Sequence, residues 1–192
     1  MGCDIHIYRE KFIDGQWVTA DVWKPCSYFS SELTTDEIGG ERNYAVFYCL
    51  AGVRQNGDGH PFSFAPRGMP PTASAEVLRE YATWDGDGHS HSFLYLHELE
   101  ELLSVLEENM VTVTGMKDRS ELAKFRAAIA ANEPGCWALL YPYCAWTNDD
   151  KSEVFCIEVP ASYQVKDQLC RIIKGLKEAG GERQRIVFWF DG

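Results

Sequence analysis

Residues 3–10 have the sequence Cys-Asp-Ile-His-Ile-Tyr-Arg-Glu. Apolar and polar side chains alternate along this stretch, which is the pattern of a β-strand with one buried face. A turn at Ile13–Gln16 follows, and Trp17, Val18 and Val22 begin a partner strand. We therefore predict a β-hairpin over residues 3–23.

The other end of the chain carries a second strand signal. Residues 185–191, Arg-Ile-Val-Phe-Trp-Phe-Asp, form an almost continuous apolar run that follows a helical pattern. Such a run is typical of a central strand that is covered on both faces. We expect this strand to lie in the same sheet as the strand at Asp4–Tyr8, with Asp191 at its carboxyl end.

The rest of the chain alternates between helical periodicity and polar loops. Loops are predicted at residues 26–43, 54–71 and 84–92, and further strands at Cys136–Trp146 and Glu153–Val159. The predicted helices are Asn43–Val53, Thr72–Tyr81 with Ser74 as a cap, Leu94–Leu106, Leu122–Asn132 and Val165–Glu178. The order of elements predicts one α+β domain over residues 1–192, with a mixed or largely antiparallel sheet and packed helices.

Composition limits the possible partners. The chain has 18 Lys and Arg residues against 29 Asp and Glu, a net charge of −11, so binding of duplex nucleic acid by charge is not expected. A small anionic ligand remains compatible with local arginines or a metal ion. No signal peptide or long apolar segment is present, and the seven dispersed cysteines are typical of reduced core thiols, so we expect a cytoplasmic protein without a membrane partner.

Two short motifs place metal-binding side chains together. Asp4 and His6 are two apart on a predicted strand and therefore share a face, and His89 and His91 repeat this spacing if extended. Carboxylate and imidazole groups are ligands for zinc or manganese. The other interpretation is that Asp4 and His6 lie on a solvated face, and that Ser90 or Ser92 caps the Leu-rich helix.

Further polar residues lie near these motifs. Asp85 and Asp87 precede His89, but an EF-hand is excluded because Leu96 stands where the loop needs a bidentate Glu. Asp191, at a strand end, is a candidate general base together with Asp87. Arg54 and Arg67 are candidates to bind an anion, although ordinary surface arginines fit the same pattern.

Several of these segments resemble a group of uncharacterised proteins from tailed phages and prophages. The resemblance rests on the opening Met-Gly-Cys-Asp-Ile-His motif, on Arg42–Tyr44 and Leu50–Arg54, on Arg67–Pro70, on Asp87–Ser92 and on the final Arg185–Asp191 run. It implies a phage-encoded protein acting in the cytoplasm of a bacterial host. It also implies that the motif residues belong to one group, but it names no substrate.

The hypothesis that combines these features is a metal-dependent hydrolase of a phosphoester or nucleotide. Asp4, His6, His89 and His91 would hold a divalent ion, with ligand atoms about 2.0–2.2 Å from zinc. Asp87 or Asp191 would assist, and Arg54 and Arg67 would bind the substrate. The alternative is a non-catalytic protein that captures a nucleotide or a host protein, and a third is a virion or assembly component.

Overall fold

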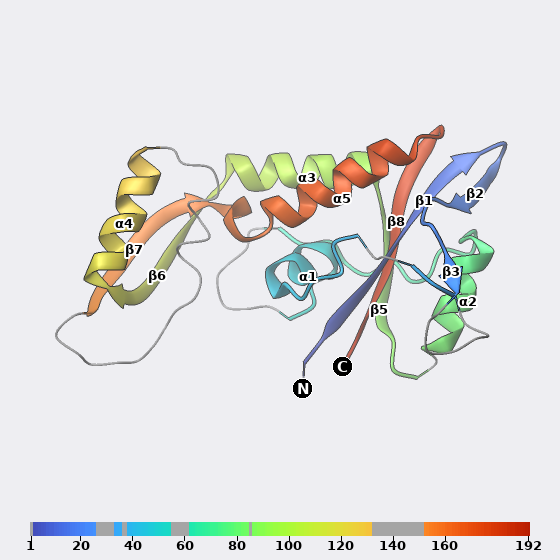
Figure 1. Cartoon of the computed structure of the whole chain (residues 1–192), viewed down its shortest axis with the longest axis horizontal. Helices are drawn as coiled ribbons and strands as arrows, with labels where there is room; N and C mark the ends of the chain where they lie inside the picture. The colour runs from blue at the N-terminus through green and yellow to red at the C-terminus, as the bar shows by residue number, and fades with distance from the viewer. Residues whose placement is uncertain (1, 26–32, 36–37, 55–61, 85, 132–151) are drawn as a thin grey trace.

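The computed structural model describes residues 2–25, 33–35, 38–54, 62–84, 86–131 and 152–192. Its centre is a four-stranded sheet in the order β2-β1-β8-β5, in which every neighbouring pair is antiparallel (Figure 1). The strands are β1 (Asp4–Ile13), β2 (Gln16–Thr19), β5 (His89–Tyr95) and β8 (Arg183–Asp191). The predicted α+β class and largely antiparallel sheet are therefore confirmed.

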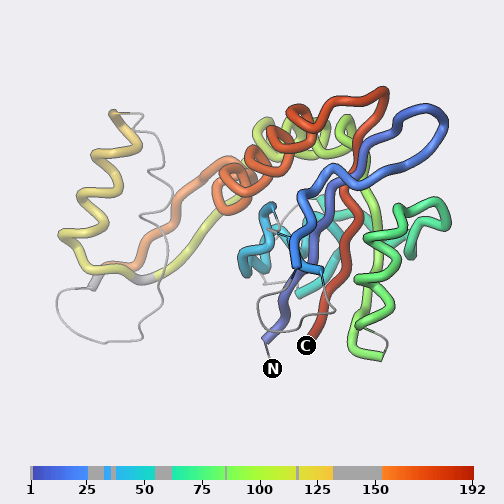
Figure 2. The backbone as a smooth tube through the Cα atoms, turned by 45° about the vertical axis from the view of Figure 1, so that its right-hand side comes forward, coloured from blue at the N-terminus to red at the C-terminus, as the bar shows by residue number. Residues whose placement is uncertain are grey.

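The prediction that the strands at the two ends of the chain share one sheet is also confirmed, and the structure shows in addition that they are neighbours. β1 and β8 are adjacent along nine residue pairs, from Asp4 opposite Asp191 to Phe12 opposite Arg183. Consequently the first and last described residues lie side by side, as both backbone views show (Figures 1 and 2). The polar residues that begin β1 and end β8 meet at this end of the two inner strands.

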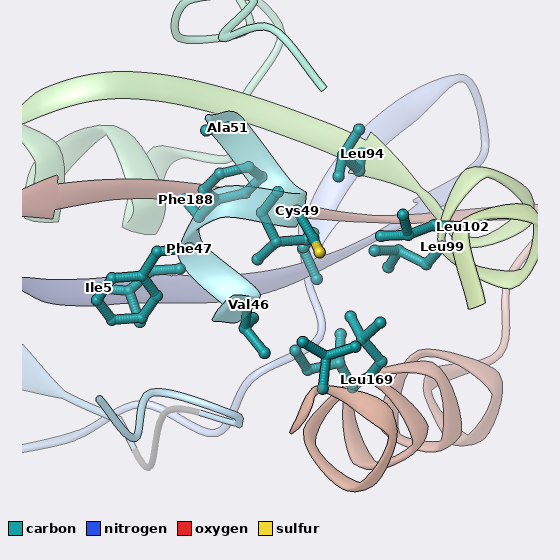
Figure 3. Close-up of a cluster of buried hydrophobic side chains, with 14 of the residues drawn as sticks. Ile5, Val46, Phe47, Cys49, Ala51, Leu94, Leu99, Leu102, Leu169 and Phe188 are labelled. Atoms are coloured by element: carbon teal, nitrogen blue, oxygen red, sulfur yellow. The ribbon is translucent and has the colours of Figure 1, made fainter. Parts of the chain in front are cut away.

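One face of the sheet is covered by three helices: α1 (Tyr44–Ala51), α3 (Leu96–Glu108) and α5 (Lys166–Ala179). The alternation of β1 aims Ile5 and Ile7 at this face, where they join Phe188 and Phe190 of β8. Figure 3 shows the side chains of α1, including Val46, Phe47 and Cys49, filling the space between the sheet and Leu169 of α5. Each large apolar side chain buried here stabilises the fold by about 1.5–3 kcal/mol relative to exposure.

The opposite face is covered by α2 (Ala75–Thr83) and its flanking loops. Tyr8, Val187 and Trp189 point to this face and pack with Val77, and Tyr81, Trp84 and Trp23 border them. This aromatic layer is separate from the larger core on the other side. It carries His6 and His91 as well, two of the four predicted metal ligands.

A smaller lobe extends from the end of α3 (Figure 1). It consists of the antiparallel strands β6 (Met110–Asp118) and β7 (Ser152–Pro160) and of α4 (Arg119–Ala130). Leu122 and Phe125 of α4 pack on Phe155 and Val159 of β7 to form its own apolar cluster. The lobe contains none of the candidate site residues.

The remaining predictions differ from the structure in a few places. The predicted loop at 84–92 is partly wrong, because β5 begins at His89, and this strand also takes the first two residues of the helix expected at Leu94. β6 had not been predicted. Two short strands pair near the loop predicted at 26–43: β3 (Lys24–Pro25) precedes it, and β4 (Leu33–Thr34) lies within it, so the loop prediction is wrong at these two residues. The strand expected at Cys136–Trp146 lies outside the described residues.

Candidate functional site

The end of the sheet at which β1 begins and β8 finishes brings His6 and Asp191 together. Asp4 and Asp191 are paired residues, and the Asp4 backbone N–H donates to Asp191 Oδ1 at 3.1 Å. The second oxygen, Asp191 Oδ2, lies 3.6 Å from His6 Nε2. At 3.6 Å the two groups are not hydrogen-bonded, but the carboxylate is near enough to favour the charged form of an imidazole, as the partner of a general acid–base group does.

Aromatic rings enclose this pair on the α2 face. The His6 ring lies 4.1 Å from the ring of Trp84 and 5.8 Å from that of Trp189, between centroids. The His6 side chain is 14% exposed and that of Asp191 is 23% exposed. The pair is therefore largely shielded: each side chain keeps a small exposed fraction, but His6 Nε2 itself is buried.

Asp4 is engaged elsewhere. Its two carboxylate oxygens accept from Arg42 Nε at 2.8 Å and from Arg42 Nη2 at 2.6 Å. The hydrogen bonds from Arg42 lower the pKa of Asp4 below its ordinary value. Both oxygens that a metal ion would need are thus occupied by a guanidinium group.

The two histidines of the His-x-His motif point to opposite faces of the sheet. β5 contains a bulge between His89 and Ser92, because Ser90 and His91 together oppose the single residue Trp189. Ser90 adopts a positive φ of 52°, which marks the extra residue. His89 consequently stacks near Phe190, on the face of the large core, whereas His91 contacts Tyr81 and Trp189 on the α2 face.

His91 is enclosed by this aromatic layer. Its ring makes an edge-on contact with Tyr81, 4.8 Å between centroids. Burial, with a smaller contribution from the charge of His89, lowers the pKa of His91. His91 Nε2 is buried and has no hydrogen-bond partner within the described part of the chain.

The predicted anion-binding arginines have separate positions. Arg67 makes a bidentate ion pair with Glu98, with its nitrogens 2.6 and 2.9 Å from the two oxygens, and its guanidinium lies over Phe64 and Phe93. Arg54 lies at the β1–β8 edge, where its Nη2 donates to Gly2 O at 3.5 Å. Of the two arginines, only Arg54 lies near the start of β1, and its guanidinium is over the ring of Tyr44 of α1, the helix that covers the face opposite His6.

Asp87 occupies the turn that leads into β5. Its side chain is exposed, and its backbone N–H donates to Trp84 O at 3.1 Å. Trp84 is the residue that covers His6, so this turn fixes one wall of the site. Asp85, in the same turn, lies outside the described residues.

The structure does not gather the four predicted metal ligands around one point. Trp189 lies between His6 and His91, His89 is on the other face, and Asp4 is bound to Arg42. Within the described ranges, no three His, Cys, Asp or Glu side chains form a group with metal-binding geometry. The edge nevertheless brings residues from the two ends of the chain together, as the shared-site hypothesis requires.

Three important residues were not identified from sequence. Trp84 and Trp189 had been assigned no role at a site, and Arg42 was noted only within a motif. Of the three, only Trp84 has a local signal, because it is an aromatic residue in a Gly- and Asp-rich loop. The partners of Arg42 and Trp189 depend on contacts across the fold, which local spacing does not specify.

Other strong polar contacts near the site have a structural role. Glu10 and Arg185 form a buried ion pair at 2.7 Å, and Glu10 Oε1 also accepts from the Ser74 backbone N–H at 2.5 Å. Arg185 donates further to Thr72 and lies over the ring of Trp17. This network attaches the segment before α2 to the sheet and so holds the cover of the aromatic layer in place.

Comparison with known proteins found no matching family, no similar curated protein and no similar solved structure. Among the described residues, no helix is long and apolar enough to cross a lipid bilayer. Functional inference therefore depends on the geometry of the site.

Proposed function

We propose that this chain is a hydrolase of a phosphoester or nucleotide in which His6, paired with Asp191, is the general acid–base group. The observation that carries the proposal is the 3.6 Å approach of Asp191 Oδ2 to His6 Nε2, in a site that is walled by Trp84 and still partly open. The resemblance to phage and prophage proteins leads us to propose further that the protein is phage-encoded and acts in the cytoplasm of a bacterial host.

The reaction follows from the chemistry of the pair. His6 removes a proton from water as the water oxygen forms a bond to phosphorus, and Asp191 stabilises the resulting imidazolium. The bond from phosphorus to the leaving oxygen then breaks, and that oxygen takes up the proton. The proton that His6 takes from water is the one it gives to the leaving oxygen, so water and the substrate are the only compounds consumed and His6 is regenerated.

Two guanidinium groups lie where the negative charge of such a substrate would be. Arg54 Nη2 donates to Gly2 O, and Arg42 Nη1 lies 2.7 Å from the position a Cβ on Gly2 would take. Both arginines are exposed, and both lie beside Gly2, two residues before Asp4. A phosphate group between them and His6 would receive charge-assisted hydrogen bonds.

The metal-dependent form of the hypothesis is kept as a variant of this proposal. His6 and Asp191 are the described pair that would ligate a divalent ion, zinc or manganese, with water completing its shell. The two forms make opposite predictions about chelation, because only the metal-dependent form needs the ion for turnover.

The experiment is a panel of phosphomonoesters, phosphodiesters and nucleotides, assayed for release of phosphate or alcohol with EDTA, zinc or manganese. We expect turnover of at least one substrate, and loss of about 10²–10⁴-fold in the Asp191→Asn variant. Turnover in EDTA would support the acid–base form and restoration by one ion the metal-dependent form. Unchanged activity in Asp191→Asn would contradict both.

A non-catalytic binding protein is the second candidate, and one observation favours it. Asp4 and Arg67, two residues expected to contact a metal or a substrate, are instead committed to ion pairs with Arg42 and Glu98. A site that holds its ligand without reacting needs no free carboxylate. Calorimetric binding of a nucleotide without any turnover would favour this alternative over the hydrolase.

A further inference from the structure

A pocket of about 340 Å³ lies at the end of the sheet opposite the His6–Asp191 pair. It opens where β5 gives way to α3 and where β8 begins, and its lining includes Tyr95, Leu96 and Arg183. β8 runs away from the pocket toward the C-terminus (Figure 1), and at about 3.4 Å per residue this strand places Asp191 about 25 Å from it. The volume is near the lower limit of pockets that hold small molecules, so a small ligand fits it.

Arg183 brings a guanidinium group to this pocket. Its Cζ lies 4.2 Å from the centre of the Phe12 ring and 5.7 Å from that of the Trp17 ring. Contact with aromatic rings uses the faces of the guanidinium and leaves its N–H edges available. Arg183 makes no ion pair or side-chain hydrogen bond with another described residue, so these N–H groups are available to an anionic group of a ligand.

Glu182, the preceding residue, supplies the opposite charge at the pocket. Its side chain is exposed and forms no ion pair, either with Arg183 or with any other residue that the structure describes. The other acidic residue of the pocket, Glu100, is neutralised by Lys177, whose Nζ lies 2.6 Å from Glu100 Oε1. The pocket therefore presents one carboxylate and one guanidinium whose charges are not compensated.

Tyr95 gives the pocket an aromatic wall. Its ring lies 6.0 Å from that of Trp17, between centroids, and Trp17 is also the ring that the Arg183 guanidinium approaches. The aromatic wall and the guanidinium thus share a neighbour. Leu96 adds an apolar side chain to the lining, so a flat or apolar group of a ligand can be buried here.

The two charges decide which class of small molecule fits. A phosphate monoester carries more than one negative charge at neutral pH and would bring the excess beside Glu182. A simple anion leaves Glu182 unpaired, and a simple cation leaves Arg183 unpaired. A free α-amino acid pairs with both, because its carboxylate accepts two hydrogen bonds from a guanidinium and its ammonium group donates to a carboxylate.

We propose that this pocket binds a free α-amino acid with an aromatic side chain. Arg183 holds the carboxylate of the amino acid, Glu182 holds its ammonium group, and Tyr95 packs on its ring. The inference goes beyond the proposed function and does not depend on it, because none of these residues belongs to the acid–base pair. The protein would then bind two different ligands at opposite ends of one sheet.

The test is an NMR titration of the wild-type chain that follows the backbone amide signals of residues 95 and 182–184. The probes are L-phenylalanine, 2-phenylethylamine, which lacks the carboxylate, 3-phenylpropionate, which lacks the ammonium group, and glycine, which lacks the ring. We expect L-phenylalanine to shift these signals and to bind at least about tenfold more tightly than each of the others. Equal affinity for any one of the three, shifts confined to other residues, or no shift at all would overturn the proposal.

Two variants assign the contacts one by one. Arg183→Gln should remove the preference for L-phenylalanine over 2-phenylethylamine, and Glu182→Gln should remove the preference over 3-phenylpropionate. The control is Arg79→Gln, which changes another exposed arginine that lies over a tryptophan ring, that of Trp23, and should keep both preferences. A preference that survives in its own variant, or one that is lost equally in Arg79→Gln, would contradict the proposed contacts.

Discussion

Glu10 and Arg185 show how single residues hold the cover of the site in place. Glu10 is fully buried and Arg185 is 1% exposed, and the pair joins β1, β8 and the segment before α2. Two charges buried together are stable only while each has its partner. Removal of one leaves the other charge in an apolar environment.

We therefore expect Glu10→Gln to lower the free energy of unfolding by about 3–5 kcal/mol, measured by urea denaturation. The matched control is Glu153→Gln, which removes the partner of Arg126 in an exposed ion pair and should cost less than about 1 kcal/mol. Similar losses of unfolding free energy in both variants would contradict the expectation that burial makes the Glu10–Arg185 pair more costly to break than an exposed pair.

His91 makes stability depend on pH. Burial lowers its pKa from the ordinary value of 6.5, so the unfolded chain binds this proton more readily than the folded one. The free energy of unfolding should consequently fall as the pH is lowered through 6.5 toward the folded pKa, and level off below it. An NMR titration of His91 that gives a pKa at or above 6.5 would contradict this expectation, and His91→Gln should remove this part of the pH dependence.

Single residues also explain why the sequence predicts only part of the site correctly. The spacing of Asp4 and His6 correctly predicts a shared face, because a regular strand repeats every two residues. The same rule fails at His89 and His91, since the bulge at Ser90 turns one of them to the other face. The positive φ of Ser90, which no local sequence pattern predicts, determines which face each histidine occupies.

At the scale of elements, α1 and α2 begin in physically different ways. Asn43 caps α1, because its Oδ1 accepts from the backbone N–H groups of Ala45 and Val46 and its Nδ2 donates to Gln164 O. Ser74 holds the corresponding position before α2, but its side chain makes no capping hydrogen bond. The sequence predicts Ser74 as a cap, and only the position is right.

Asn43→Ala should therefore destabilise the protein by about 1–2 kcal/mol, whereas Ser74→Ala should change the free energy of unfolding by a few tenths at most. Thermal or urea unfolding of the two variants measures the difference. If Ser74→Ala proved as costly as Asn43→Ala, the assignment of the two caps would be wrong.

Helices and central strands were predicted well because their apolar periodicity is strong. Ile5 and Ile7 mark β1, and Leu99, Leu102 and Leu106 mark the buried stripe of α3. β5 was mistaken for a loop because its first four residues are His and Ser, which propensity places in turns. It forms a strand because β8 offers it a full edge of hydrogen-bonding groups.

At the scale of the whole molecule, the cysteines differ in burial and therefore in expected reactivity. Cys3 and Cys49 are buried and free, and burial raises the pKa of Cys49 to about 12, whereas Cys156 and Cys170 are exposed. Buried thiols with a raised pKa react slowly.

Thiol titration of the native protein should therefore modify Cys156 and Cys170 ahead of Cys3 and Cys49. Under denaturing, non-reducing conditions all seven cysteines should react. Recovery of five or fewer would indicate a disulfide and contradict the expectation of a reducing compartment.

The account as a whole depends on His6 being the group that reacts at the junction of the two chain ends. His97 provides a matched control, since it is an exposed histidine on α3 that stacks on Tyr95, away from Asp191. Neither His6→Gln nor His97→Gln should leave a large cavity, because glutamine occupies most of the volume of histidine.

The most direct measurement is the turnover of a nucleotide or other phosphoester by the wild-type chain, His6→Gln and His97→Gln at equal concentration. The account predicts that His6→Gln loses about 10²–10⁴-fold in kcat while His97→Gln retains wild-type activity. Turnover by His6→Gln at the wild-type rate, or equal losses in both variants, would contradict it.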